Sequence, residues 1–402
     1  MDHIAIIGAG QAGYSVATNL RNHGFDGKIS IYGAEDAAPY ERPPLSKNFL
    51  MGNIDSDGLL FRDDAFYQEQ NIDLFLEAEI DKIEVGANRF KYQDDWVHYD
   101  HLVLATGSNP KTLPDSLGGA LDGLFYLRHL KDAKALKTKL SDIKNLLVIG
   151  GGFIGLEIAA VAAEQGLSVT VVEMGDRILQ RAIGSSASDC IRKIHQDHGV
   201  SILECTSLQQ LVGDVAGHVC KAILSDGKEI STDAVIVGIG ASPETRLAAN
   251  AGLLLDNGIR VNEFGQTSVG NIWAAGDCTS FPLSDDFIRL ESVQNAVDQG
   301  EVVARNIMGQ NLPYKPVPWF WTEQYDSRLQ IVGLQDSHNQ CVMRPGKKDE
   351  SLSYWYFRER KLQAVEVFND PKTYMLAKKI IEANKLIDPV SIADPATNLK
   401  KL

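Results

Sequence analysis

Apolar residues occur along this chain in short uninterrupted runs that stop at glycine-rich turns. The first run covers residues 4–7. A turn at 8–13 follows it, then a helix of small residues expected over 14–22 and a second strand over 28–33. Continuous apolar runs are typical of parallel strands covered on both faces, whereas half-exposed strands alternate. The pattern therefore predicts a strand–turn–helix–strand unit of an α/β fold.

The same pattern returns in the middle of the chain. Residues 146–149 form an apolar run, a glycine turn over 150–155 follows, and a helix through Glu164 leads to a strand over 168–173. Gly166 stands where a glycine commonly ends a helix. This repetition predicts two domains of the same kind, each with a parallel sheet.

Three more buried strands are expected, one at 101–107 between the two units and two after the second unit, at 233–240 and 271–277. From about Pro316 the composition changes, with aromatic strand-like segments at 319–321 and 354–357 before an amphipathic helix over 374–384. We therefore predict an α/β protein with two Rossmann-like dinucleotide-binding domains and a C-terminal α+β domain. The expected boundaries are 1–112 with 240–318 for the first domain, 113–239 for the second and 319–402 for the third.

Each glycine turn carries the G-x-G-x-x-G pattern. Its first glycine permits a tight turn, its second lets backbone approach a pyrophosphate, and its third lets helix and strand pack closely. Glu35 (or Asp36) follows Gly13 by 22 residues and Glu173 follows Gly155 by 18, near the ~20 expected for the acid that binds a ribose. One match is weak, but two in the same context predict two dinucleotides in one chain. The turn residues expected at the cofactors are Gly8, Gly10, Ala12, Gly13, Gly150, Gly152, Phe153, Ile154 and Gly155.

Two dinucleotides in one protein imply electron transfer between them, typically from a nicotinamide to a flavin. In such proteins the N-terminal unit usually carries FAD and the internal unit the nicotinamide nucleotide. The Glu173 carboxylate can accept hydrogen bonds from both adenosine ribose hydroxyls and would repel a 2′-phosphate. Such bonds contribute about 1.5–3 kcal/mol, which predicts a preference for NADH of tenfold or more. Arg177 lies four residues later and could bind the phosphate of NADPH instead.

Bulk properties narrow the function further. A chain of 402 residues is expected to form two or three domains, and its net charge of −14 argues against nucleic acid as a partner. No apolar run reaches the roughly 18 residues that span a bilayer. The chain enters an apolar strand at residue 4 with no basic region or cleavage site before it, which argues against a signal peptide. We therefore expect no membrane contact and a cytoplasmic location.

The five cysteines, at 190, 205, 220, 278 and 341, contain no C-x-x-C pair. Neither a disulfide framework nor a thiolate metal site is indicated, and mostly buried, reduced thiols are expected. With no cysteine before residue 190, a dithiol beside a flavin is excluded, so electrons must leave the flavin directly. His195 and His198 could share a helix face as metal ligands, but no partner motif accompanies them and a solvated helix face is favoured. No metal site is predicted.

At this point the chain resembles the FAD-containing ferredoxin reductases of bacterial oxygenase systems over essentially its whole length. The shared motifs are YERPPLSK at 40–47, ATGS at 105–108, AAGDC at 274–278, RLES at 289–292 and PWFW at 318–321. The first and last are specific to that group. The resemblance implies a reductase that oxidises NADH and passes single electrons to a [2Fe–2S] ferredoxin, which feeds a Rieske aromatic-ring dioxygenase or a cytochrome P450.

The resemblance also implies roles for individual residues. Lys47 would lie near the flavin N5 edge, and Glu157 would reach the nicotinamide and pair with Lys47. Arg42 would bind the FAD diphosphate or the adenine side, Asp277 the ribitol chain, and Trp321 would lie at the flavin edge facing the acceptor. The other residues implied at the cofactors are Ala105, Thr106, Gly107, Gly240, Gly276, Glu291, Ser292 and Val293. The alternatives are a surface ion for Arg42, a solvated Lys47 and a core position for Trp321.

Two basic clusters are candidate docking residues for an acidic ferredoxin, namely Arg344, Lys347 and Lys348, and Lys378 with Lys379. Two other functions stay open on the sequence. One is an NADH oxidase or quinone-type reductase with no protein acceptor. The other is a redox-responsive flavoprotein like the apoptosis factors, which share these two folds.

Overall fold

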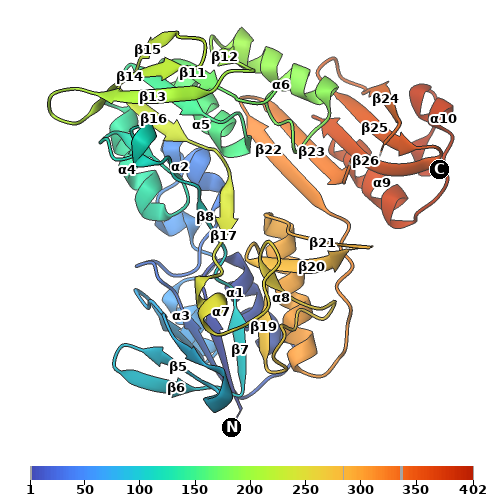
Figure 1. Cartoon of the computed structure of the whole chain (residues 1–402). Helices are drawn as coiled ribbons and strands as arrows, with labels where there is room; N and C mark the ends of the chain where they lie inside the picture. The colour runs from blue at the N-terminus through green and yellow to red at the C-terminus, as the bar shows by residue number, and fades with distance from the viewer. Residues whose placement is uncertain (1, 284, 336–337, 402) are drawn as a thin grey trace. The chain divides into compact units, whose positions relative to one another are not determined.

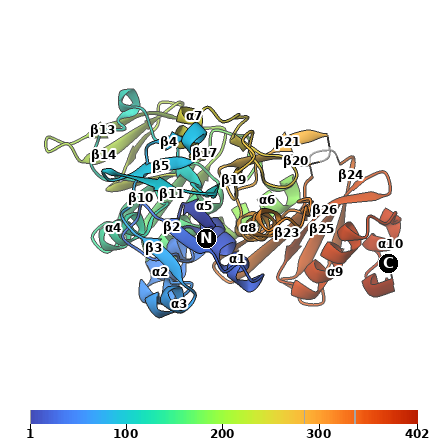
Figure 2. The same ribbon diagram turned by 90° about the horizontal axis from the view of Figure 1, so that it is seen from below.

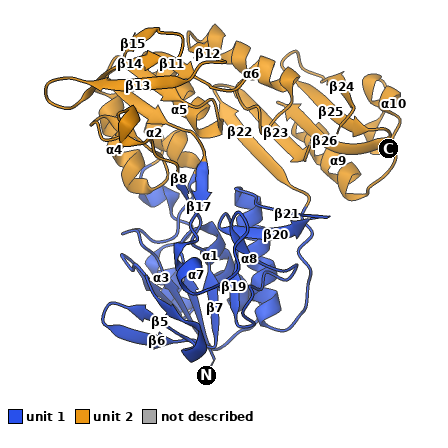
Figure 3. Cartoon of the chain, in the orientation of Figure 1, with its two compact units in different colours: residues 1–42, 55–109, 241–316 blue, residues 43–54, 110–240, 317–402 orange. Residues whose placement is uncertain are grey.

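The computed structural model describes residues 2–283, 285–335 and 338–401 (Figure 1). It divides into two compact units, which are coloured separately in Figure 3. The first unit contains residues 1–42, 55–109 and 241–316, and the second contains 43–54, 110–240 and 317–402. Residues 43–54, which the predicted boundaries assign to the first domain, cluster here with the second unit.

The first unit is built on a parallel sheet with the strand order β3-β2-β1-β7-β19. These strands are β1 (His3–Ile7), β2 (Lys28–Tyr32), β3 (Ile72–Phe75), β7 (His101–Leu104) and β19 (Ile272–Ala274). Helices α1 (Gln11–Asn22) and α8 (Val293–Ile307) pack against each other. Gly300 of α8 allows this close approach, because a Cβ there would lie only 2.8 Å from the Ser15 side chain of α1.

The remaining elements of the first unit surround this sheet. Strands β4, β5 and β6 form an antiparallel meander between β3 and β7 in the sequence. The bounds are α3 (Asp64–Glu69), β4 (Ile83–Glu84), β5 (Arg89–Tyr92), β6 (Asp95–His98), β8 (Ser108–Pro110), β17 (Ala241–Pro243), α7 (Arg246–Asn250), β18 (Ile259–Arg260), β20 (Thr279–Leu283) and β21 (Asp286–Ile288).

The second unit contains a similar parallel sheet in the order β12-β11-β10-β16-β9, whose first four strands repeat the order β3-β2-β1-β7. The fifth strand differs, because β9 precedes its sheet partners in the sequence whereas β19 follows them. Here too a meander, β13-β14-β15, separates the outer strand β12 from the return strand β16. The bounds are α2 (Asn48–Met51), β9 (Leu124–Phe125), α4 (Leu130–Leu140), β10 (Asn145–Ile149), α5 (Phe153–Glu164), β11 (Ser168–Val172), α6 (Ser185–Asp197), β12 (Ser201–Leu203), β13 (Leu208–Gly213), β14 (Val219–Leu224), β15 (Glu229–Ser231) and β16 (Ala234–Val237). The predicted doubled unit is confirmed.

The C-terminal part of the second unit is an antiparallel sheet in the order β22-β23-β26-β25-β24. Helix α9 packs against β23 and β26, and Figure 2 shows it beside these strands. The bounds are β22 (Trp319–Gln324), β23 (Ser327–Gly333), β24 (Gln340–Pro345), β25 (Leu352–Arg358), β26 (Lys361–Phe368), α9 (Pro371–Glu382) and α10 (Pro389–Ala393). This confirms the predicted α+β composition of the C-terminal region.

The expected elements are present, with differences at their ends. The strands expected over 101–107, 233–240 and 271–277 pair only over their first part, because their last residues turn away at the sheet edge. The C-terminal helix begins three residues early, at Pro371, because the Asp370 side chain accepts a hydrogen bond from the Thr373 N–H. Among the described residues, no helix is both long and apolar enough to cross a membrane.

Candidate functional site

The first glycine turn follows β1, and its three glycines meet different surroundings. Gly8 has a φ of 118°, and a Cβ there would lie 2.0 Å from the carbonyl oxygen of Ala105. A Cβ at Gly13 would lie 2.0 Å from the carbonyl oxygen of Gly8. Gly10 has an ordinary φ of −87°, and no described protein atom lies within 4 Å of where its Cβ would be. The fold therefore requires glycine at 8 and 13 but not at 10.

The second turn, after β10, has the same geometry. Gly150 has a φ of 101°, and its Cβ would lie 2.3 Å from the carbonyl oxygen of Gly238. A Cβ at Gly155 would lie 2.5 Å from the Gly150 carbonyl oxygen. At Gly152, with a φ of −83°, the nearest described atom is the Gly238 carbonyl oxygen at 3.9 Å.

In both turns, therefore, the middle glycine leaves open space that the protein does not fill. Helices α1 and α5 begin directly after Gly10 and Gly152, and the first N–H groups of a helix have no partner within it. Open backbone at a helix N-terminus is the surrounding that a pyrophosphate requires. The two turns fit two dinucleotides.

Strand register brings other expected residues to the same edge as the first turn. Ile7 of β1 pairs with Leu104 of β7, which pairs with Ala274 of β19. Residues 105–107 and 275–277 therefore emerge beside Gly8. Within this edge, Thr106 Oγ1 donates a 2.6 Å hydrogen bond to the Glu244 carbonyl oxygen, and Ser108 Oγ donates one of 3.3 Å to the Asp277 carboxylate.

The Gly276 backbone and the start of α8 complete this group. Gly276 has a φ of 86° and donates its N–H to Gln299 Oε1 at 2.8 Å, and its Cβ would lie 2.9 Å from that of Ala12. Ser292 caps α8 by accepting a 3.0 Å hydrogen bond from the Asn295 N–H. Its neighbours Glu291 and Val293 consequently lie at the helix start.

The acid after β2 is already engaged by neighbouring side chains. Arg42 Nη2 lies 2.6 Å from Glu35 Oε1, and the Tyr40 hydroxyl donates a 2.7 Å hydrogen bond to Glu35 Oε2. The Arg42 guanidinium also stacks over the Tyr40 ring, 5.0 Å from its centroid. Arg42 is thus part of an ordered cluster with the ribose-binding candidate and is not an isolated surface ion.

Glu173, the corresponding acid after β11, is held by backbone instead. Its Oε2 accepts a 2.7 Å hydrogen bond from the N–H of Gly151, inside the second glycine turn, and its Oε1 accepts one of 2.7 Å from the N–H of Gly175. Each carboxylate oxygen has a second lone pair and can accept a further bond from a ribose hydroxyl.

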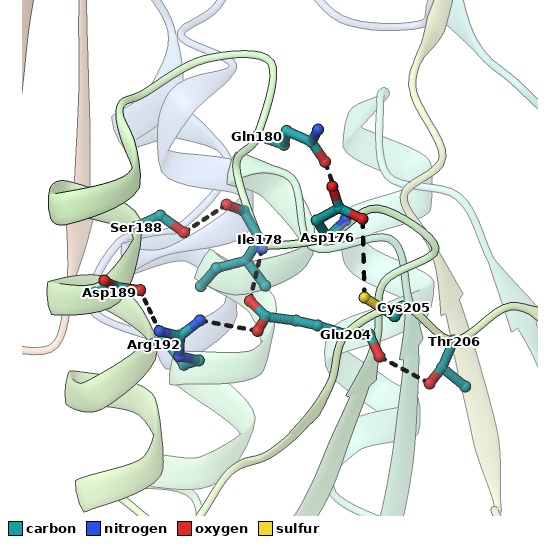
Figure 4. Close-up of polar contacts among 9 residues, drawn as sticks. All are labelled: Asp176, Ile178, Gln180, Ser188, Asp189, Arg192, Glu204, Cys205 and Thr206. Atoms are coloured by element: carbon teal, nitrogen blue, oxygen red, sulfur yellow. Dashed lines mark hydrogen bonds and ion pairs between the residues drawn. The ribbon is translucent and has the colours of Figure 1, made fainter.

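The loop that follows Glu173 is tied to α6, as Figure 4 shows. Glu204 Oε1 accepts a 2.9 Å hydrogen bond from the Ile178 N–H, and Oε2 forms a 2.8 Å ion pair with Arg192 of α6. The Ser188 hydroxyl, also on α6, donates to the Ile178 carbonyl oxygen at 2.8 Å. These contacts fix the loop that carries Arg177 in one conformation.

Arg177 lines a cavity of about 480 Å³ that is also lined by residues of the C-terminal sheet, including Tyr356. Beside that tyrosine, Glu366 is 1% exposed and accepts hydrogen bonds from the Tyr356 hydroxyl (2.6 Å) and the Gly184 N–H (2.7 Å). Burial raises the pKa of Glu366 to about 7. The positive charge of Arg177 acts in the opposite direction and lowers this pKa. Arg177 is therefore electrostatically coupled to Glu366, besides lying near Glu173 in the sequence.

The two expected catalytic residues form an ion pair within the second unit. Lys47 Nζ lies 2.7 Å from Glu157 Oε2, with side chains only 15% and 6% exposed. Glu157 lies on the first turns of α5, and Lys47 directly precedes α2. Burial strengthens such a pair electrostatically and makes loss of either partner costly. Lys47 is therefore not the solvated lysine that the sequence left as an alternative.

Two hydroxyls that the sequence analysis did not single out complete the environment of Glu157. Ser46 Oγ donates a 2.5 Å hydrogen bond to Oε2, and Thr322 Oγ1 of β22 donates one of 2.7 Å to Oε1. Thr322 is next to Trp321, which was predicted from the PWFW motif. The motif located the strand, but nothing in the sequence indicated that the following residue would reach back to α5.

Trp321 lies on β22 beside Trp319, with ring centroids 5.5 Å apart. It is only partly buried, so that it is not the core tryptophan that the sequence left as an alternative. This partial exposure leaves part of the indole accessible to a ligand.

His195 does not lie on a solvated helix face, and that expectation is wrong. It is 0% exposed, its Nε2 lies 2.7 Å from Gln324 Oε1, and burial lowers its pKa to about 4. The reason is that the C-terminal sheet covers this face of α6, which periodicity along a single helix cannot reveal. Among the described residues, no group of three or more histidines, cysteines, aspartates and glutamates is placed to bind a metal.

Arg344 is not available for docking, contrary to its place in the basic cluster. It is 9% exposed and donates hydrogen bonds to the carbonyl oxygens of Ile392, Asp394, Pro395 and Thr397. Its role is to fix the last turn of the C-terminal domain. Lys347, Lys348 and Lys379 are exposed.

The expectation of mostly buried thiols is also wrong. Cys205, Cys220 and Cys341 are exposed and Cys190 is intermediate, so that Cys278 alone among the five is buried. All five are free thiols, as expected from their spacing.

Comparisons with known proteins agree with this geometry. Residues 2–300 match the family model of pyridine nucleotide-disulphide oxidoreductases, and residues 319–402 match the reductase C-terminal domain. The chain is 40% identical to rhodocoxin reductase of Rhodococcus erythropolis, over 99% of this chain and 93% of that protein.

Two solved structures are similar along the whole chain. The ferredoxin reductase of the CYP199A2 system from Rhodopseudomonas palustris has a TM-score of 0.97 at 36% identity, covering 100% of this chain and 99% of that one. The covalent putidaredoxin reductase–putidaredoxin complex has a TM-score of 0.95 at 34% identity, covering 100% and 97%. These matches confirm the predicted fold class, the resemblance to ferredoxin reductases, and an oxidoreductase that uses FAD and NAD(P)H. The chain therefore belongs to the pyridine nucleotide-disulphide oxidoreductase family.

Proposed function

We propose that this protein oxidises NADH through a bound FAD and passes single electrons to a [2Fe–2S] ferredoxin, which feeds a Rieske dioxygenase or a cytochrome P450 in the cytoplasm. The observation that carries the proposal is the pair of glycine turns whose middle glycines leave room for two dinucleotides. The absence of any cysteine before residue 190 supports direct electron transfer from the flavin to the acceptor.

The first turn, with Thr106, Gly107, Gly276 and Asp277, would hold FAD. When bound, FAD accepts two electrons as a hydride and releases them one at a time, which is what links a nicotinamide to a one-electron carrier. Ser108 orients the Asp277 carboxylate by donating a hydrogen bond, so that its remaining lone pairs are available to cofactor hydroxyls.

The second turn would hold NADH, with Glu173 selecting it over NADPH. Because the Gly151 and Gly175 amides fix both carboxylate oxygens, a 2′-phosphate would meet a negative charge that cannot easily turn away. Ribose hydroxyls would instead find two acceptors already oriented.

The Lys47–Glu157 pair would set the charge and position of groups where the hydride is transferred. Lys47 supplies a buried positive charge, and Glu157 holds the ammonium group at 2.7 Å. A preorganised charge in a buried site favours the state in which negative charge develops beside it. This is the contribution of the chain itself to the reaction.

The identity of the electron acceptor rests on the relatives. One is named a rhodocoxin reductase, and another was solved in covalent complex with putidaredoxin. In this chain, Trp321 on the edge strand β22 and the exposed Lys347, Lys348 and Lys379 are the candidates for contact with an acidic ferredoxin. A net charge of −14 means that such a partner must dock on a local basic surface.

The test is NADH-dependent reduction of cytochrome c by the purified flavoprotein, with and without a [2Fe–2S] ferredoxin. Strong stimulation by ferredoxin, weakening with rising salt, is expected. If several ferredoxins give no stimulation while oxygen is consumed rapidly, the protein is an NADH oxidase. A very slow reaction with NADH, accompanied by a change of oligomeric state, would instead indicate an apoptosis-factor-like function.

A further inference from the structure

A continuous line of buried side chains leads away from Glu157 through the second unit. Thr322 donates to Glu157 Oε1 at 2.7 Å, and Gln324 Nε2 lies 3.0 Å from Thr322 Oγ1. Gln324 Oε1 in turn lies 2.7 Å from His195 Nε2. These four residues are between 0% and 5% exposed.

The hydrogen bonds of this line all point the same way. The Glu157 carboxylate only accepts, so the Thr322 hydroxyl must donate to it and must accept from the Gln324 amide nitrogen. The amide oxygen of Gln324 therefore faces His195, whose Nε2 must carry the proton. Hydrogen bonds in series polarise one another, and here each donor points toward the carboxylate.

His195, at the far end, is anchored between elements. Its Nδ1 lies 3.3 Å from the hydroxyl of Tyr325, which is in the turn between β22 and β23. His198, the residue directly after α6, stacks on the Tyr325 ring with the ring centroids 3.7 Å apart. Tyr325 has a φ of 53°, a conformation that L-residues rarely adopt. The turn is thus clamped to α6 by its aromatic side chain.

We propose that Thr322, Gln324 and His195 are positioning residues, which hold the Glu157 carboxylate in the orientation that binds Lys47. The inference rests on the function proposed above for the Lys47–Glu157 pair. Without Thr322, Oε1 would lose its donor on this side, and the carboxylate could rotate away from Ser46 and Lys47, which both bind Oε2.

A stability role alone accounts poorly for this arrangement. Burying polar side chains costs free energy that their hydrogen bonds only partly recover, and apolar residues of the same volume are often at least as stabilising. Side chains alternate along β22, so that Thr322 and Gln324 lie on its buried face. Glu323 between them is exposed and pairs with Arg328 at the surface.

The experiment measures anaerobic flavin reduction by NADH in stopped flow, on FAD-loaded protein. Thr322→Val keeps the volume but removes the hydroxyl, and we expect the rate constant at saturating NADH to fall about tenfold with little change in the NADH dissociation constant. The rate constant of Thr322→Ser should lie within about twofold of that of the unchanged protein, because serine keeps the hydroxyl donor. Glu323→Gln, on the exposed face of the same strand, is the matched control and should leave it unchanged.

A double-mutant cycle tests whether Thr322 acts through Glu157. In a Glu157→Gln background, adding Thr322→Val should change the rate constant less than about twofold, because the group that it orients is already altered. A second readout needs no flavin. The ¹⁵N chemical shifts of His195 in the apoprotein should show a neutral imidazole protonated at Nε2 at pH 7, and Gln324→Leu should alter them.

The outcomes separate the two ideas. If Glu157→Gln slows flavin reduction but Thr322→Val does not, the positioning inference is wrong while the function of the pair stands. If neither slows it, the role of Glu157 itself fails and the inference falls with it. If Thr322→Val proves unfolded, the decision passes to Gln324→Leu and to the His195 tautomer, where protonation at Nδ1 would overturn the inference.

Discussion

In the two Rossmann-like halves, four sheet strands have the same order and the glycine turns have the same geometry, yet the candidate ribose-binding acids are held differently. In the first half, Glu35 is held by the side chains of Tyr40 and Arg42. In the second half, Glu173 is held by the backbone amides of Gly151 and Gly175. Glu35 therefore depends on two neighbouring side chains for its orientation, whereas Glu173 depends on the backbone.

Under the function proposed above, the first half holds FAD and the second binds NADH. The two acids would then serve different nucleotides, although four strands of the surrounding sheets match. The most direct test of this comparison is to block each glycine turn separately.

The largest effect is expected from Gly10→Val and Gly152→Val. Both positions have ordinary φ values and open space, so the fold should survive while each side chain occupies the place of a pyrophosphate. Gly10→Val should purify without FAD. Gly152→Val should keep FAD but lose saturable reduction by NADH. Flavin absorbance after gel filtration and stopped-flow titration measure the two losses, and FAD retention by Gly10→Val would contradict the assignment.

The next effect concerns Lys47 of the second unit, which is proposed to act where the hydride is transferred. Lys47→Ala should retain FAD but slow flavin reduction by at least about tenfold, because a buried positive charge is lost from the site. Stopped-flow absorbance measures the rate, and the exposed Lys228→Ala is the control for removal of a lysine. An unchanged rate would mean that Lys47 only stabilises the fold.

A smaller effect tests the selectivity of the second acid. Glu173→Ala should narrow the NADH-over-NADPH ratio of kcat/KM by about tenfold, mainly by weakening the reaction with NADH. Glu35→Ala should leave this ratio unchanged, because Glu35 belongs to the first turn. Steady-state assays with both nucleotides measure this ratio. An equal change of the ratio in both variants would show that Glu173 is not the specific determinant of nucleotide choice.

The smallest effect is expected on the pH dependence of stability, through the Glu366 carboxyl in the C-terminal region of the second unit. Burial raises the pKa of Glu366 to about 7, so folding favours its protonated form. Its stabilising contribution is full below the unfolded pKa of about 4.5 and is lost as pH rises through about 7. Between pH 5 and 8, the Tm of Glu366→Gln should therefore decrease by about 2–4 °C less than the Tm of the unchanged protein, as measured by scanning calorimetry. Parallel curves would show that other groups set this dependence.

Much of the fold could be predicted because short segments of the sequence carry its signals. Continuous apolar runs ending at glycines identified both parallel sheets, and the aromatic segments identified the C-terminal strands. The two meanders, β4–β6 and β13–β15, were missed because they lie between stronger signals. Their strands are partly exposed and carry no long apolar run.

The site was predictable where backbone geometry demands a residue type, as at Gly8 and Gly150, and where a motif is specific, as at Lys47. It was not predictable where distant strands supply side chains. Thr322 and Ser46 reach Glu157 from positions 165 and 111 residues away in sequence, and His195 is buried by a sheet that no local pattern reveals. Arg344 carried the right charge for docking, but its carbonyl partners come from the chain's last turns.

The interleaving of the two units has a consequence for synthesis on the ribosome. The edge strand of the first sheet, β19, spans Ile272–Ala274, so that sheet cannot close until most of the chain has been made. The second unit waits longer still, because β22, whose threonine binds Glu157, begins at residue 319. Neither half corresponds to one continuous piece of the gene, and a nascent chain must hold both units incomplete at the same time. Slow or interrupted translation after residue 240 should therefore expose this protein to misfolding more than interruption near its end.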